Sequence, residues 1–73
     1  MEVDFQKMKE QMEITLDGII KYDPPKFQRA NFKELEDCAR IMCDVFRLVT
    51  RDQAIELRKM VKEARKRSKE ILK

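Results

Sequence analysis

Residues 31–73 read NFKELEDCARIMCDVFRLVTRDQAIELRKMVKEARKRSKEILK. Apolar residues recur in this segment at steps of three and four, which is the spacing of one face of an α-helix. We predict two consecutive helices, 32–49 and 51–72. Thr50 and Gln53 have the spacing of a capping box, in which the threonine hydroxyl accepts from the backbone amide three residues later. A second capping box is predicted at Asn31 and Glu34.

The join between these two predicted helices leaves almost no loop. A compact antiparallel pair usually needs a longer connection. The two helices are therefore expected to meet at a corner near Thr50, with fusion into one long helix as the alternative.

The helix at 32–49 has an apolar face that is too broad for one partner helix. It is therefore expected to be the central helix of the core, contacted from at least two sides. Its apolar positions form two neighbouring rows: Phe32, Leu35, Ala39, Met42, Phe46 and Val49 in one, and Cys38, Ile41, Val45 and Leu48 in the other.

The helix at 51–72 has a narrow seam with the heptad spacing of a coiled coil. Because this seam is longer than either other helix can cover, its tail is expected to fray or to pair with a second copy of the chain. We prefer a homodimer, because a small chain has a small core and oligomerisation supplements it. The expected dimer seam consists of Leu57, Val61, Ala64 and Ile71.

The segment before residue 24 predicts a third helix, 4–22, with Asp4 as its cap. Phe5, Met8, Met12, Leu16 and Ile19 form its apolar stripe. A β-hairpin at 14–22 is the alternative, because an Asp-Gly pair between β-branched residues is a strong hairpin signal. Neither face of that hairpin would be cleanly apolar, so the helix is preferred. The two prolines at 24 and 25 are expected to end this helix, with 26–30 as the connection.

The predicted fold class is therefore all-α: a single helical domain over 1–73, built as a three-helix, dimeric helical bundle. The net charge of +3 is unevenly distributed. Residues 51–73 hold nine Lys or Arg against four Asp or Glu, so the basic character belongs to the C-terminal helix. Its candidate residues for binding a nucleic acid or an acidic partner are Arg58, Lys62, Arg65, Lys66 and Lys69.

Chemistry is not expected of this chain. It has no histidine, which is the commonest acid–base catalyst at neutral pH. Cys38 and Cys43 lie five residues apart on one predicted helix, too far apart to form a disulfide with each other, and they lack the further ligands of a zinc site. They are expected to be small buried apolar residues, with a cysteine pairing across a dimer as the alternative. We predict no catalytic residue, no metal and no cofactor.

The remaining expectation is a non-enzymatic adaptor or regulator that acts by protein–protein interaction through its helical bundle. The alternative is a nucleic-acid-binding regulator that uses the basic C-terminal helix. No leader pattern and no apolar run of about 20 residues is visible. We therefore expect no membrane partner and an intracellular, cytoplasmic location.

Overall fold

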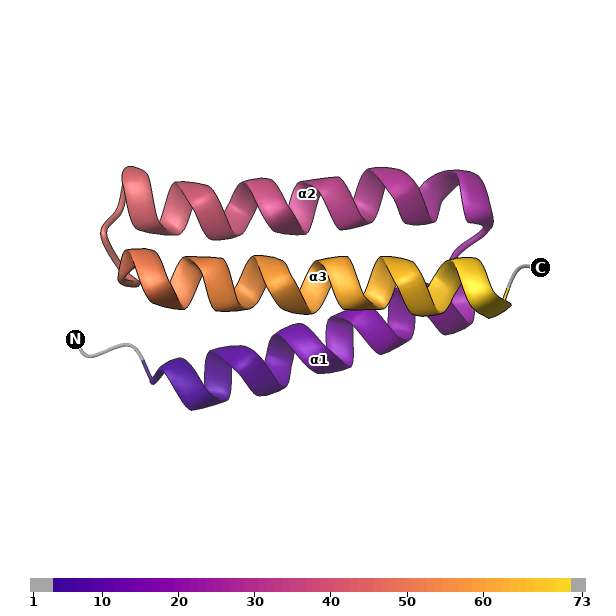
Figure 1. The fold of residues 1–73 in the computed structure, drawn as a ribbon, viewed down its shortest axis with the longest axis horizontal. Coiled ribbons are helices and arrows are strands. Elements are labelled where there is room, and N and C mark those ends of the chain that lie inside the picture. The colour runs from indigo at the N-terminus through magenta and orange to yellow at the C-terminus, as the bar shows by residue number, and fades with distance from the viewer. Residues whose placement is uncertain (1–3, 72–73) are drawn as a thin grey trace.

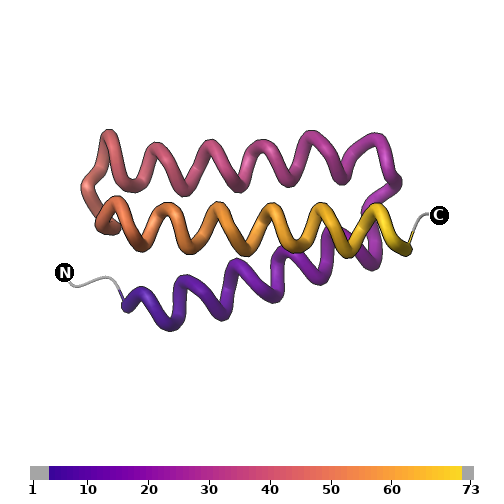
Figure 2. The backbone as a smooth tube through the Cα atoms, in the orientation of Figure 1, coloured from indigo at the N-terminus to yellow at the C-terminus, as the bar shows by residue number. Residues whose placement is uncertain are grey.

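The computed structural model describes residues 4–71, which form three helices: α1 (Phe5–Tyr22), α2 (Pro25–Asp44) and α3 (Arg51–Ile71). They lie lengthwise in a rod with extents of 41 × 19 × 16 Å. α2 runs antiparallel to its two neighbours, so the α1–α2 turn and the α2–α3 turn lie at opposite ends of the rod (Figure 1; Figure 2). The all-α three-helix prediction is confirmed.

α1 begins and ends close to where its sequence predicts. The Asp4 carboxylate accepts from the backbone amides of Gln6 and Lys7, at 3.0 and 3.3 Å, which confirms the predicted cap. Met12, Leu16 and Ile19 are buried, as expected for the apolar stripe. Residues 14–22, where a hairpin was the alternative, are helical in the structure.

α2 begins seven residues earlier than predicted. Pro25 occupies the first helical position, where a missing amide costs nothing and the fixed φ of proline favours the helix. The predicted connection 26–30 is therefore helical, and the predicted capping box at Asn31 is wrong. Asn31 lies inside α2, and its side-chain amide donates to the Asp23 carboxylate at 2.6 Å.

The α2–α3 connection also differs from the expected corner. α2 ends at Asp44, and residues 45–50 reverse the chain, so α2 and α3 pack side by side and antiparallel. Arg47 provides part of the reversal with a φ of 53°. The predicted capping box at the start of α3 is confirmed. The backbone amide of Gln53 donates to the Thr50 hydroxyl at 3.1 Å, and the backbone amide of Thr50 donates to Gln53 Oε1 at 2.9 Å.

α3, not α2, is the central helix. Both other helices pack against α3, whereas α1 and α2 contact each other only sparsely. The narrow seam of α3 is buried along almost its whole length, because α1 and α2 cover it from two sides. The buried members of this seam are Ala54, Leu57, Val61, Ala64 and Ser68.

A buried polar cluster joins the three helices near the α1–α2 turn. Gln28 of α2 is 5% exposed. Its side-chain amide donates to the backbone carbonyl of Asp23 at 2.9 Å and, at 3.4 Å, to that of Ile20, while its carbonyl oxygen accepts from the Ser68 hydroxyl of α3. Every polar atom of the Gln28 side chain therefore has a partner, which makes its burial tolerable.

Candidate functional site

Four large apolar side chains are exposed where α2 ends and turns toward α3. We call this group, Ile41, Val45, Phe46 and Leu48, the apolar turn cluster. Val45 and Phe46 are 65% and 64% exposed, although both were expected to face the core. The backbone of the turn is well bonded: the Phe46 amide donates to the carbonyl of Ile41, and the Leu48 amide donates to that of Met42, at 3.2 and 2.8 Å.

The sequence carries the signal for this cluster in the second apolar row of the predicted helix 32–49. That row predicts a second partner helix, whereas the structure leaves it exposed. In the structure Cys38, Ile41, Val45 and Leu48 of that row are exposed, while Phe32 and Ala39 of the first row are buried. The broad apolar face thus combines a first row that packs on the bundle through Phe32 and Ala39 with a second row that, together with Phe46, stays exposed.

A second surface is rich in cations. It runs along the contact between α2 and α3, on the side that faces away from the core. Arg40, Arg51 and Arg58 line a hollow of about 220 Å³ between α2 and α3. Farther along the same contact, a hollow of about 190 Å³ is lined by cations from both helices, among them Arg29, Arg65 and Lys69. Lys62 lies beside Arg58 at a third hollow. We call Arg29, Arg40, Arg51, Arg58, Lys62, Arg65 and Lys69 the basic face.

Few carboxylates compensate the basic face. Arg65 lies 3.4 Å from the carboxylate of Glu36, without the orientation of a hydrogen bond, and Arg40 lies 3.2 Å from that of Asp37. Asp44 lines the first hollow. Within residues 4–71, no carboxylate lies within 4.0 Å of the charged groups of the other members, which are Arg29, Arg51, Arg58, Lys62 and Lys69.

The structure gathers four of the five basic residues predicted as a binding site. Arg58, Lys62, Arg65 and Lys69 belong to the basic face, whereas Lys66 lines a different hollow, between α1 and α3. Sequence reasoning missed three members, Arg29, Arg40 and Arg51. Arg29 and Arg40 lie on α2 and join the others only through the antiparallel packing of α2 and α3, and Arg51 is the first residue of α3, seven positions before Arg58.

The expected dimer seam has a different role in this fold. Leu57, Val61 and Ala64 are fully buried between α1 and α2 of the same chain, so they are not available to a second copy. Ile71, the remaining member, is 67% exposed. The homodimer stays a prediction, and in this fold it would need another surface.

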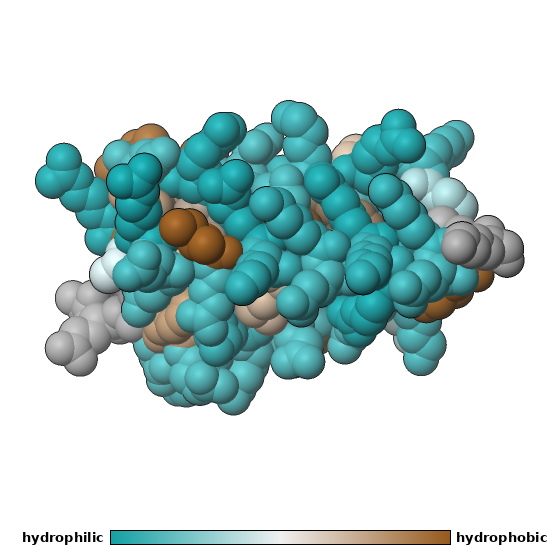
Figure 3. All heavy atoms as spheres, viewed as in Figure 1, coloured by the Kyte–Doolittle hydropathy of each residue, from teal (hydrophilic) through white to brown (hydrophobic). Residues whose placement is uncertain are grey.

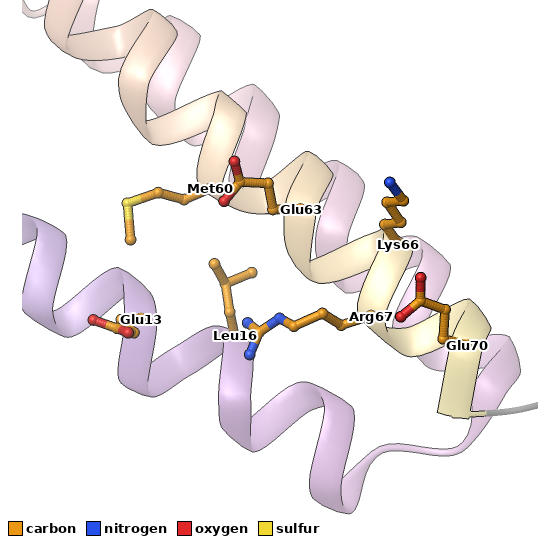
Figure 4. Close-up of a pocket in the computed structure, with 7 residues that line it drawn as sticks. All are labelled: Glu13, Leu16, Met60, Glu63, Lys66, Arg67 and Glu70. Atoms are coloured by element: carbon orange, nitrogen blue, oxygen red, sulfur yellow. The ribbon is translucent and has the colours of Figure 1, made fainter.

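A further hollow, of about 440 Å³, lies between α1 and α3 (Figure 4). Leu16 points from α1 toward α3, while Met60 and Arg67 extend from α3 toward α1. Arg67 pairs with Asp17 at 3.3 Å. Lys66 points away from α1, as Figure 4 shows. The hollow combines an apolar floor with charges of both signs, and this arrangement indicates ordinary ion pairing between two helices.

The two cysteines are free thiols on α2. Cys43 is half-buried, but Cys38 is exposed, so the expectation of a buried residue is wrong for Cys38. Across residues 4–71, no group of three or more Cys, Asp or Glu side chains is arranged to hold a metal ion. None of the helices described here combines the length and the apolar composition that a membrane span requires.

Comparison of this chain with protein-family models, with curated proteins and with solved structures gives no match.

Proposed function

We propose that this chain is a non-enzymatic adaptor or regulatory protein that binds another protein through the apolar turn cluster. The observation that carries this proposal is the exposure of Ile41, near the end of α2, together with Val45, Phe46 and Leu48 in the turn that follows. Contiguous exposed apolar groups of this kind mark contact sites, because their burial removes apolar surface from water. Phe46 is the expected anchor, since aromatic side chains dominate the energy of many interfaces.

The residues around the cluster specify the chemistry of the partner. Arg47 lies within the turn, and Arg51 begins the helix that follows it. Interfaces combine an apolar centre with a polar rim. Because Asp44 and Asp52 accompany these arginines, the complementary partner is a protein segment with apolar side chains at its centre and charged residues of both signs at its edge.

A photoreactive phenylalanine analogue placed at position 46 tests this proposal. The matched control places the same analogue at Tyr22, which is 75% exposed and lies near the other end of the rod. We expect position 46, but not position 22, to cross-link one protein in native lysate. The purified partner should then bind the unmodified chain, and Phe46→Asp should weaken that binding at least tenfold.

Three results would contradict the proposal. Equal cross-linking from both positions would mean that exposure alone determines capture. Unchanged affinity of Phe46→Asp would remove the cluster from the interface. A cross-link from position 46 to a second copy of this chain would replace the adaptor with a homodimer that uses this surface.

The alternative function, a nucleic-acid-binding regulator, is supported by a different observation. The basic face carries cations from two helices with few carboxylates beside them. Its geometry allows a more specific inference about the ligand.

A further inference from the structure

The basic face is a continuous track along the rod. From Arg51, its α3 members follow at steps of seven, four, three and four residues, and these steps keep them on one side of the helix. Arg51 and Lys69 are separated by 18 residues, or about 27 Å along the axis of α3. Across the contact with α2, Arg29 and Arg40 widen the track near its two ends.

Little apolar surface accompanies these cations. Figure 3 shows the face of the molecule that carries α3, and most of it is hydrophilic. Ile55, which is 52% exposed, lies among the cations at two of the hollows. A protein partner would need buried apolar or aromatic anchors at the centre of the contact, and a membrane surface would need an apolar face to embed. A ligand recognised mainly by charge fits this surface better.

The spacing of charge favours a double-stranded nucleic acid. A duplex presents one phosphate charge per about 1.7 Å of its length, so a track of about 27 Å lies beside many phosphates at once. Arginine forms paired hydrogen bonds with phosphate oxygens, and most members of the basic face are arginines.

The same face lacks the groups that read bases. Within residues 4–71, it presents no aromatic side chain to stack on a base. The glutamines nearest to it are engaged elsewhere, since Gln28 is buried and Gln53 caps α3. Contacts to phosphate alone fix position without reading sequence.

We propose that the basic face binds the phosphate backbone of a double-stranded nucleic acid without reading its sequence. This goes beyond the adaptor function and does not depend on it, because none of Ile41, Val45, Phe46 and Leu48 belongs to the basic face; Arg51, beside the cluster, is the residue that the two surfaces share. The chain would thus bind a duplex along its side and a protein at its end.

Fluorescence anisotropy with labelled 20-bp DNA duplexes of two unrelated sequences tests the proposal. We expect equal affinity for both duplexes, and a logarithm of the association constant that falls linearly with the logarithm of KCl concentration. The variant Arg58→Gln with Lys62→Gln should weaken binding at least tenfold at 100 mM KCl. For this variant, the slope of the logarithm of the association constant against the logarithm of KCl concentration should be less steep by about 2, because each lost phosphate contact removes about 0.9 from that slope.

The matched control is Lys7→Gln with Lys21→Gln. It removes the same net charge from exposed positions on α1, and its affinity should stay within about twofold of the wild type. If circular dichroism shows that the Arg58→Gln, Lys62→Gln variant does not fold, the variant Arg51→Gln with Lys69→Gln repeats the test at the two ends of the track.

Each contrary outcome overturns the proposal. Equal weakening by the basic-face and control variants would mean that net charge, not this surface, attracts the duplex. Absence of binding at 50 mM KCl would exclude a duplex ligand. Binding to phosphatidylglycerol vesicles or to polyglutamate, without binding to the duplex, would assign the face to a membrane or to an acidic protein.

Discussion

Gln28 is a buried polar side chain that links α2 to α3 and to the end of α1 at the α1–α2 turn. Gln28→Leu has nearly the same size but removes the partner of the Ser68 hydroxyl and of the Asp23 carbonyl. A buried polar group that loses its partner costs about 1–3 kcal/mol. We therefore expect the free energy of unfolding to fall by about 2 kcal/mol, measured by urea denaturation with circular dichroism at 222 nm.

Two further variants make this prediction specific. Gln11→Leu introduces the same chemical change on the exposed side of α1 and should alter the free energy of unfolding by less than about 0.5 kcal/mol. Adding Ser68→Ala to Gln28→Leu should recover part of the loss, because removal of both partners leaves fewer unsatisfied groups. A double variant that is as unstable as the sum of the single ones would refute the pairing of Gln28 with Ser68.

The sequence predicted the caps but not the polar cluster. Asp4 and the Thr50–Gln53 pair were identified correctly, because capping depends on residues that are two or three positions apart. Asn31 has a similar spacing to Glu34 but lies inside α2. The contact of Gln28 with Ser68 joins residues 40 positions apart, and no local pattern predicts such a pair.

At the scale of the element, Gly18 distinguishes the helical α1 from the alternative hairpin. Its φ is negative, and an added Cβ would meet no atom within 4 Å. Gly18→Ala should therefore raise the free energy of unfolding by about 0.5–1 kcal/mol, since alanine loses less backbone entropy in a helix. Thermal unfolding monitored by circular dichroism measures the change.

A hairpin at 14–22 would respond in the opposite way. The glycine of an Asp-Gly hairpin turn adopts a positive φ, which alanine tolerates poorly. A lower stability of Gly18→Ala would therefore contradict the helix. Glu10→Ala serves as the control, because it places an alanine at an exposed position of the same helix and should shift stability by less than about 0.5 kcal/mol.

The bounds of α2 show where the sequence pattern was insufficient. The prolines at 24 and 25 correctly ended α1, but Pro25 also begins α2, since proline suits the first helical position. At the other end, apolar residues continue past Asp44 at helical spacing, so periodicity predicted helix where the chain turns. Arg47 adopts a left-handed φ in this turn without the glycine that would have signalled it.

At the scale of the molecule, stability depends on α3 because both other helices pack on it. Leu57 is fully buried in that contact. Leu57→Ala should lower the free energy of unfolding by about 3 kcal/mol through lost apolar burial and the cavity that remains. Ile55→Ala, two residues away at a half-exposed site, should cost less than about 1 kcal/mol. Similar losses for both variants in urea denaturation would contradict the central position of α3.

The number of helices and the apolar seam of α3 could be predicted from the sequence, but the partners of that seam could not. Heptad spacing in Leu57, Val61 and Ala64 describes a surface suited to another helix, and it is the same whether that helix belongs to the same chain or to a second copy. The pattern also predicted the cations of α3, whereas their convergence with Arg29 and Arg40 depends on how α2 folds back.

The contacts that hold the three helices together are unevenly distributed along the bundle. Near the α1–α2 turn, the Gln28 cluster ties all three helices together, while toward its N-terminal end α1 diverges from α2 (Figure 2). Phe5 and Met8 at that end are only partly buried. Local opening begins where buried contacts are fewest. The first turns of α1 should therefore exchange their amide hydrogens sooner than its last turns. Local unfolding would then begin at the N-terminal end of α1, while the helices stay packed at the α1–α2 turn.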